Sequence, residues 1–171
     1  MHVRHGCLAL GMMAVLAAGA CRAGGQAEAR LDAADGLRRM YERAASARAL
    51  QHYRDVLDAQ RRRDLRVAVR AAQGMGATLQ QLGSLQASLE AYREALALAS
   101  RVGDPLLESG AGSDLGFALA LAGDQAASLD EADRHCQSAL AVARDRGGLG
   151  EEARALVCQA EVIYSRGASL E

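Results

Sequence analysis

Most of the sequence repeats a pair of amphipathic helical segments, and this repetition limits the folds available to the chain. The clearest pair spans residues 69–102, where a tight turn at Gly83 separates two segments whose small and apolar residues recur at helical spacing. We expect Gly103 to end the second of these helices. The first segment carries Ala72, Met75, Gly76 and Leu79, and the second carries Leu85, Ser88, Leu89, Tyr92, Ala95 and Leu96. Neither segment can bury its stripe alone, so the pair requires neighbouring pairs.

The same residue pattern recurs elsewhere in the chain. In the second segment, Ser88, Tyr92 and Ala95 place a small, a bulky and a small residue on one face. This triad recurs 44 residues later and is anticipated 39 residues earlier. The copies are Ala132, Cys136 and Ala139, and Ala49, Tyr53 and Val56; the matching small residues of the first segments are Gly76, Gly116 and Ala160, and the turn glycines are Gly83, Gly123 and Gly167. The shared shift predicts an all-α fold of tandem helical hairpins with a period of about 40 residues.

The pattern over Ala72–Ala95 resembles the tetratricopeptide repeat, whose usual period is about 34 residues. The longer spacing is similar to an extended variety found in bacterial regulators and sensors. The resemblance implies a right-handed superhelical stack of antiparallel hairpins, an α-solenoid, with units at about 29–65, 66–105 and 106–148 and a partial unit at 150–171. In the last helix we expect Leu156, Ala160 and Ile163 to face inward. We expect this helix either to cap the array or to be followed by more of a longer protein.

The resemblance also implies a concave groove, lined by the first helix of each hairpin, that takes an extended or helical peptide. Carried onto this sequence, the groove residues are Arg70, Gln73, Ala77, Gln80, Ser113, Asp114, Phe117, Leu121, Arg154, Val157, Glu161 and Tyr164. The set of basic and Asn residues with which some family members hold a C-terminal carboxylate is missing, so that ligand is not implied. Phe117 is the best single candidate contact, and packing against the next helix is the alternative role for its ring.

The N-terminus has the features of an export signal. Arg4 is followed by 14 uncharged residues, which is shorter than the roughly 20 needed to span a bilayer but typical of a signal-peptide core. Ala17–Cys21 resembles the lipobox of bacterial lipoproteins, in which the cysteine is lipidated, although Ala18 replaces the usual Leu. The alternative is cleavage after Ala20, which leaves Cys21 as an ordinary thiol. We therefore expect a signal peptide over residues 1–20, a tether over 21–28, and an exported, periplasmic lipoprotein anchored in the outer membrane.

Two cysteines remain in the repeat region. Cys136 and Cys158 lie on segments that should pack together, and disulfides persist in exported proteins. A bridge is one prediction; two buried thiols are the other, because Cys136 occupies the position that Tyr92 fills in the preceding unit. His135 lies beside Cys136, but no second pair of ligands has suitable spacing, so we predict no metal site.

The residue patterns of common enzymes are missing from the sequence. The glycine-rich run over residues 110–116 follows no strand, and its third glycine is one residue late for a dinucleotide-binding loop. We therefore predict no catalytic residues and no cofactor. The formal net charge is −1, and removal of Arg4 with the signal makes it −1 − 1 = −2, so we predict no nucleic-acid partner.

Two classes of function remain open at this level. The first is a stand-alone adaptor that binds a partner protein or peptide in its groove and contacts the membrane only through a lipid anchor on Cys21. The second is the exported sensory front of a longer signalling protein, such as a diguanylate cyclase or histidine kinase. The reading frame beyond Glu171 distinguishes the two.

Overall fold

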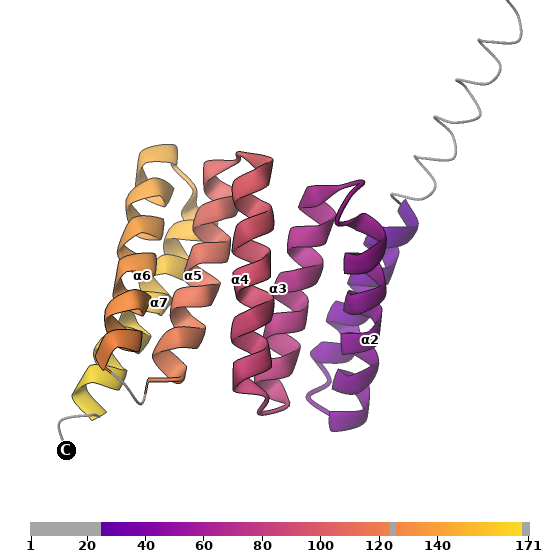
Figure 1. Ribbon diagram of the computed structural model, residues 1–171, viewed down its shortest axis with the longest axis horizontal. Helices are drawn as coiled ribbons and strands as arrows, with labels where there is room; N and C mark the ends of the chain where they lie inside the picture. Colours follow the sequence, from indigo (N-terminus) through magenta and orange to yellow (C-terminus); the bar gives the residue numbers. More distant parts are fainter. Residues whose placement is uncertain (1–24, 124–125, 169–171) are drawn as a thin grey trace, which may run out of the picture.

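The computed structural model describes residues 25–123 and 126–168, and the regular structure of these residues is entirely helical (Figure 1). The helices span residues 25–38, then Arg43–Gln60 (α2), Leu65–Gln81 (α3), Leu85–Val102 (α4), Pro105–Leu121 (α5), Ala126–Arg146 (α6) and Leu149–Ala168 (α7). The predicted all-α fold is confirmed for this part of the chain. The predicted signal peptide and the lipidation site at Cys21 lie outside the described residues, and residues 25–28, predicted to be tether, are helical.

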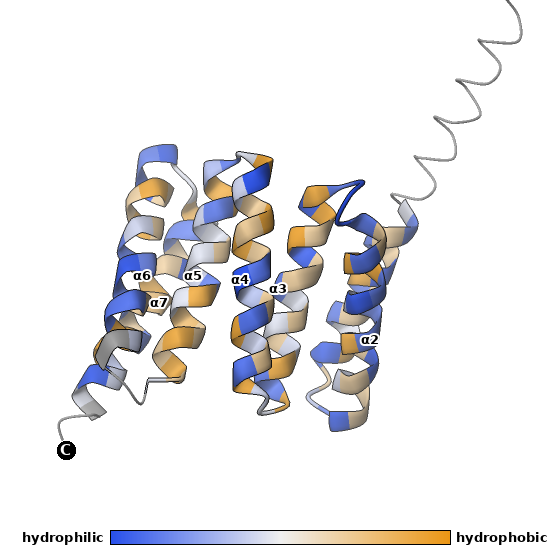
Figure 2. Ribbon diagram, viewed as in Figure 1, coloured by the Kyte–Doolittle hydropathy of each residue, from blue (hydrophilic) through white to orange (hydrophobic). Residues whose placement is uncertain are grey.

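The helices form a row in which each one packs against the next. Figure 1 shows them standing side by side from α2 to α6, with α7 alongside α5 and α6. In addition, α5 contacts both α3 and α7, so the first helices of successive hairpins also touch one another. Hydrophobic and hydrophilic residues are interleaved along the helices (Figure 2), as expected for elements that bury one face. None of the described helices is both long and apolar enough to span a membrane.

The turns at Gly83 and Gly103 use the residues that the sequence suggested, whereas Gly167, predicted as a turn glycine, lies within α7. Gly83 and Gly103 have φ angles of 77° and 73°, a left-handed conformation that glycine adopts without strain. Pro105 occupies the first turn of α5, and the Asp104 side chain accepts hydrogen bonds from the backbone N–H groups of the next turn. Asp64 caps α3 in the same way. The predicted turn at Gly83 and helix end at Gly103 are confirmed.

The small–bulky–small triad brings the two helices of a hairpin close together. The Tyr92 ring lies over Gly76, where a Cβ atom would come within 2.7 Å of the ring. The fully buried Ser88 donates a hydrogen bond of 2.9 Å to the carbonyl oxygen of Gly76. A side chain larger than hydrogen at position 76 would push α3 away from α4, which explains the pairing of this glycine with the triad.

The third unit repeats this arrangement with sulfur in place of an aromatic ring. A Cβ on Gly116 would lie 3.1 Å from the Cys136 sulfur and 2.7 Å from that of Cys158. The two cysteines form a disulfide between α6 and α7, with their Cα atoms 5.5 Å apart. Both residues are fully buried. The last two helices of the described chain are therefore covalently joined beneath α5.

One predicted burial pattern in α7 is wrong. The sequence favoured Leu156, Ala160 and Ile163 as the inward residues, but Leu156 is 44% exposed and Ile163 is 71% exposed. Instead, α7 packs on α5 and α6 through Ala155, Cys158 and Val162. The α3 face equivalent to the α7 face that was predicted to be buried contacts α4, the second helix of the same hairpin. Within the described residues α7 has no such second helix, so this face is exposed.

Candidate functional site

Two adjoining cavities run along the inner helices of the array, and together they are called the groove below. Their volumes are about 350 Å³ and about 440 Å³. The first is lined by Gln80, Tyr92, Ser113, Asp114, Phe117, Ala153, Arg154 and Val157, and the second by Asp35, Arg38, Arg39, Arg70, Gln73, Gly74, Ala77, Tyr92, Asp114 and Arg154. Tyr92, Asp114 and Arg154 line both cavities, so the groove is continuous from the helix at 25–38 across α3 and α5 to α7.

Most of the residues predicted for the groove line it, but three do not. Leu121 is the last residue of α5 and is exposed beyond the end of the groove. Glu161 and Tyr164 lie one and two turns after Val157 on α7, and neither lines the groove. The resemblance selects residues of the first helices that line the groove, but it also includes residues beyond the end of the groove.

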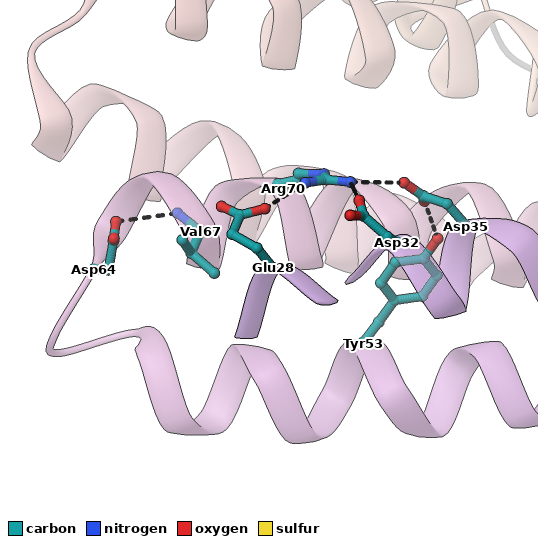
Figure 3. Close-up of polar contacts among 7 residues, drawn as sticks. All are labelled: Glu28, Asp32, Asp35, Tyr53, Asp64, Val67 and Arg70. Carbon is teal, nitrogen blue, oxygen red and sulfur yellow. Dashed lines mark hydrogen bonds and ion pairs between the residues drawn. The ribbon is translucent and has the colours of Figure 1, made fainter. Parts of the chain in front are cut away.

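The N-terminal part of the groove is polar, and Arg70 is its most connected residue (Figure 3). The guanidinium of Arg70 donates to Glu28 at 2.5 Å, to Asp32 at 2.6 Å and to Asp35 at 3.0 Å. The hydrogen bond to Asp32 makes the largest contribution to a raised pKa of Arg70, and Asp35 and Glu28 add to it. Because three carboxylates already neutralise it, Arg70 anchors the first helix to α3 and is not available as a free cation.

Tyr53 extends this network into the core. Its hydroxyl donates a hydrogen bond to Asp35, and its ring is fully buried against Gly74. Burial, assisted by the hydrogen bond to Asp35, raises the pKa of Tyr53 to about 12. This network was not predicted from the sequence, although Glu28, Asp32 and Asp35 lie four and three residues apart, the spacing that places three carboxylates on one helix face.

Arg38 and Arg39 are the cations that the polar part of the groove offers to a ligand. Neither forms an ion pair with any residue in the described ranges. The Nε atom of Arg38 is buried and lacks a hydrogen-bond partner among these residues. Since Arg38 and Arg39 both line the groove, a carboxylate bound there could accept a charge-assisted hydrogen bond from a guanidinium. The sequence analysis did not select either arginine.

Asp114 joins three helices at the middle of the groove. It accepts a 2.7 Å hydrogen bond from the Gln73 amide of α3, and Arg154 of α7 lies 3.7 Å away. Burial raises the pKa of Asp114, while Arg154 and the Gln73 hydrogen bond act in the opposite direction. The three predicted residues therefore come together as one cluster, which crosses the inner surface from α3 to α7.

The C-terminal part of the groove is apolar. Phe117 lines the cavity and also packs against the buried cluster formed by α4, α5, α6 and α7, so its ring takes part in core packing. Its role as a ligand contact stays a prediction. Ala153 and Val157 of α7 face it across the cavity, and Tyr92 closes the floor. The Tyr92 hydroxyl lies 3.5 Å from the Gln80 side-chain oxygen, and burial raises the pKa of Tyr92. This end suits an apolar side chain.

The groove has the chemistry of a binding surface. Among the described residues, no group of three His, Cys, Asp or Glu side chains is arranged to hold a metal ion. His135 lines a separate cavity between α5 and α6, and burial lowers its pKa. Comparison with known proteins shows that no protein-family model matches the sequence and that no curated protein matches it. The interpretation of the groove therefore rests on its own residues.

Proposed function

We propose that this chain is an exported binding module of the tetratricopeptide-repeat type, whose groove holds an extended segment of a partner protein. The proposal includes a right-handed superhelical stack of the hairpins and the absence of catalytic activity. It is supported by the order of the helices, since the first helices of successive hairpins contact one another and together line the groove. Backbone and side chains of an extended peptide can follow such a surface over several units.

The continuity of the groove is the observation on which the proposal depends most. Each part has a volume within the range of about 300 to 1,000 Å³ that is usual for ligand sites, and the two parts differ in chemistry. Arg38 and Arg39 lie at the polar end, and Phe117 and Val157 lie at the apolar end. A segment that carries an acidic residue several positions away from a large apolar residue satisfies both ends.

We further propose that the protein acts in the periplasm, held to the outer membrane by a lipid on Cys21. The apolar run near the N-terminus and the lipobox-like Ala17–Cys21 support this location, and so does the disulfide, since such bonds persist in oxidising compartments. Incorporation of labelled palmitate that is lost in the Cys21→Ser variant would support the anchor. Unprocessed protein in the cytosol would contradict export.

Site-specific crosslinking tests the groove. A photoreactive amino acid is placed at Phe117 or at Arg154 in the native cell envelope, and the control position is Gln137, an exposed residue of α6 outside the groove. We expect the two groove positions to capture the same protein and the control position not to capture it. The captured segment is then synthesised, and its binding to the purified chain is measured.

The binding measurement separates loss of contact from loss of fold. We expect Arg154→Ala to weaken binding of the captured segment by about tenfold, as for a side chain contributing 1 to 2 kcal/mol. Gln137→Ala should leave the affinity unchanged. The helical content and midpoint of thermal unfolding of both variants should match those of the parent chain. Equal capture from the groove and control positions, or unchanged affinity in the groove variant, would contradict the proposal.

A further inference from the structure

The solvent face of α7 is apolar along its whole length. Leu149 is 80% exposed, Ile163 is 71% exposed and Tyr164 is 73% exposed. At about 100° per residue, these side chains fall in one sector about 120° wide with other apolar or small residues of the helix. We call this set the α7 stripe: Leu149, Ala153, Leu156, Val157, Ala160, Ile163, Tyr164 and Gly167. Continuous apolar patches of this kind on a folded protein mark contact surfaces.

The shape of the α7 stripe suits close contact with another helix. Its centre consists of small residues seven positions apart, Ala153, Ala160 and Gly167. Larger apolar side chains lie on both sides of this centre. Small residues along the middle allow two helix axes to approach closely, and the larger residues at the sides then pack around the contact. A helix that carries the same pattern is therefore a complementary partner.

The charges at the edges of the α7 stripe determine the direction of that partner. One edge carries Glu152 near the start of the helix and Arg166 near its end, and the other carries Arg154 followed by Glu161. When two copies of α7 pack antiparallel about a two-fold axis, each edge meets the same edge of the other copy. Glu152 then lies opposite Arg166, and Arg154 lies opposite Glu161. A parallel pair matches only Glu152 with Arg154 and leaves the other two charges unmatched.

The edge residues can make these contacts while keeping those within their own chain. Arg166 already bonds Asp130 at 2.9 Å and Asp133 at 3.1 Å, but a guanidinium has five donors. Glu152 accepts from Arg144 at 2.8 Å through one of its two oxygens. Arg154 is separated from Asp114 by 3.7 Å and has the most exposed side chain of the three. Each edge therefore retains capacity for a second partner.

We infer that the protein forms a two-fold symmetric homodimer in which the α7 stripes of two copies pack antiparallel. This interface overlaps the groove only at Ala153 and Val157 of the stripe and at Arg154 of its edge. The dimer places two grooves side by side. The inference does not depend on what the grooves bind.

The mass of the full chain in solution is the first test. We expect the mass measured by sedimentation equilibrium to rise with concentration toward twice that of one chain. The Ile163→Arg variant should raise the dissociation constant by roughly thirtyfold or more, the effect expected at a large apolar residue packed within an interface. Because Ile163 is largely exposed in the single chain, the variant should keep its helical content. Met40→Arg, at an exposed residue at the far end of the array, is the matched control and should dimerise normally.

Disulfide trapping tests the direction of the helices. In an antiparallel pair, the two copies of residue 149 lie roughly 27 Å apart, while residue 149 of one copy lies beside residue 167 of the other. In a background of Cys7→Ser and Cys21→Ser, we expect a mixture of Leu149→Cys and Gly167→Cys chains to form a crosslinked dimer on oxidation. Neither variant alone should do so.

Three outcomes would overturn the inference. A chain that stays monomeric at its highest soluble concentration has no such interface. A dimer that is unaffected by Ile163→Arg uses another surface. Crosslinking of Leu149→Cys chains with one another would show a parallel pair.

Discussion

The two ends of the helical array are held together by different chemistry. At the N-terminal end, Arg70 of α3 joins the first helix through three carboxylates, and Tyr53 supports one of them from below. At the C-terminal end, a disulfide between Cys136 and Cys158 joins the last two helices beneath Gly116. The same repeat position holds Tyr53, Tyr92 and Cys136 in turn. The repeat thus preserves the helix packing while the side chain at this position changes from polar anchor to covalent link.

This contrast predicts that the two ends respond to different conditions. The polar end depends on charge and proton concentration, and the covalent end depends on redox state. Four changes test whether the two ends respond independently, and they are given in order of decreasing expected effect on stability.

Loss of the disulfide should have the largest effect. The bond closes a loop with a sequence separation of 22 residues, and removing such a constraint from the unfolded chain costs about 3 kcal/mol of folding free energy. We expect this loss in urea unfolding after reduction, and also in the Cys136→Ala/Cys158→Ala variant. Hydrogen exchange should become faster in α6 and α7 and change little in the helix at 25–38. Uniformly faster exchange would show that the two ends are not separate.

Removal of the Arg70 side chain should destabilise the other end of the array, where the first helix packs. In Arg70→Ala, Glu28, Asp32 and Asp35 face one another without a cation. Because these carboxylates are all partly exposed, we expect a loss of about 1 to 2 kcal/mol, above that of a single surface ion pair. Exchange should become faster in the first helix and in α2. Arg101→Ala, at an exposed position on α4, is the control and should be near neutral.

The hydroxyl of Tyr53 should contribute less to the folding free energy than the Arg70 side chain does. In Tyr53→Phe the ring stays packed on Gly74 but the hydrogen bond to Asp35 is lost, so we expect a loss of about 1 kcal/mol at neutral pH. The same variant tests the pKa. Because the folded pKa of Tyr53 is raised to about 12, its neutral form adds stability below pH 10 that is lost as pH rises from 10 to 12. The variant should lose part of this alkaline dependence, since Tyr92 retains its own raised pKa. An unchanged alkaline profile would contradict the assignment.

Added salt should have the smallest effect. Screening weakens the ion pairs of Arg70 because they are partly exposed, while the buried disulfide is insensitive to ionic strength. We expect about 0.5 kcal/mol of destabilisation at moderate salt in the parent chain, and less in Arg70→Ala. An equal salt dependence in the two proteins would show that the network adds no electrostatic stability.

The sequence was most informative where helices pack on their neighbours in the chain. The hairpin at 69–102 could be predicted because its apolar spacing, its turn at Gly83 and its end at Gly103 agree. The groove residues of α3 and α5 were selected through the resemblance to the tetratricopeptide repeat, which that spacing carries. These features depend on local spacing, which a single sequence displays directly.

The features that could not be predicted depend on the positions of helices relative to one another. Arg70 contacts carboxylates that are 35 to 42 residues away, and no local pattern specifies the rotation that brings them together. Arg38 and Arg39 were missed because they lie where the first helix ends, in the unit to which the repeat pattern assigned no groove residue. The inner face of α7 was predicted wrongly for a related reason. Its periodicity marks two apolar faces, and the face that is buried depends on which helices are adjacent.

Tyr92 belongs to the hydrophobic core and also forms the floor of the groove. Its ring packs directly against the α3 backbone at Gly76, because glycine places no side chain between them. A ligand that contacts the Tyr92 ring therefore acts directly on the packing between α3 and α4. Binding of a ligand in the groove should therefore make the α3–α4 hairpin more rigid, and slower amide hydrogen exchange in α3 and α4 should report both effects.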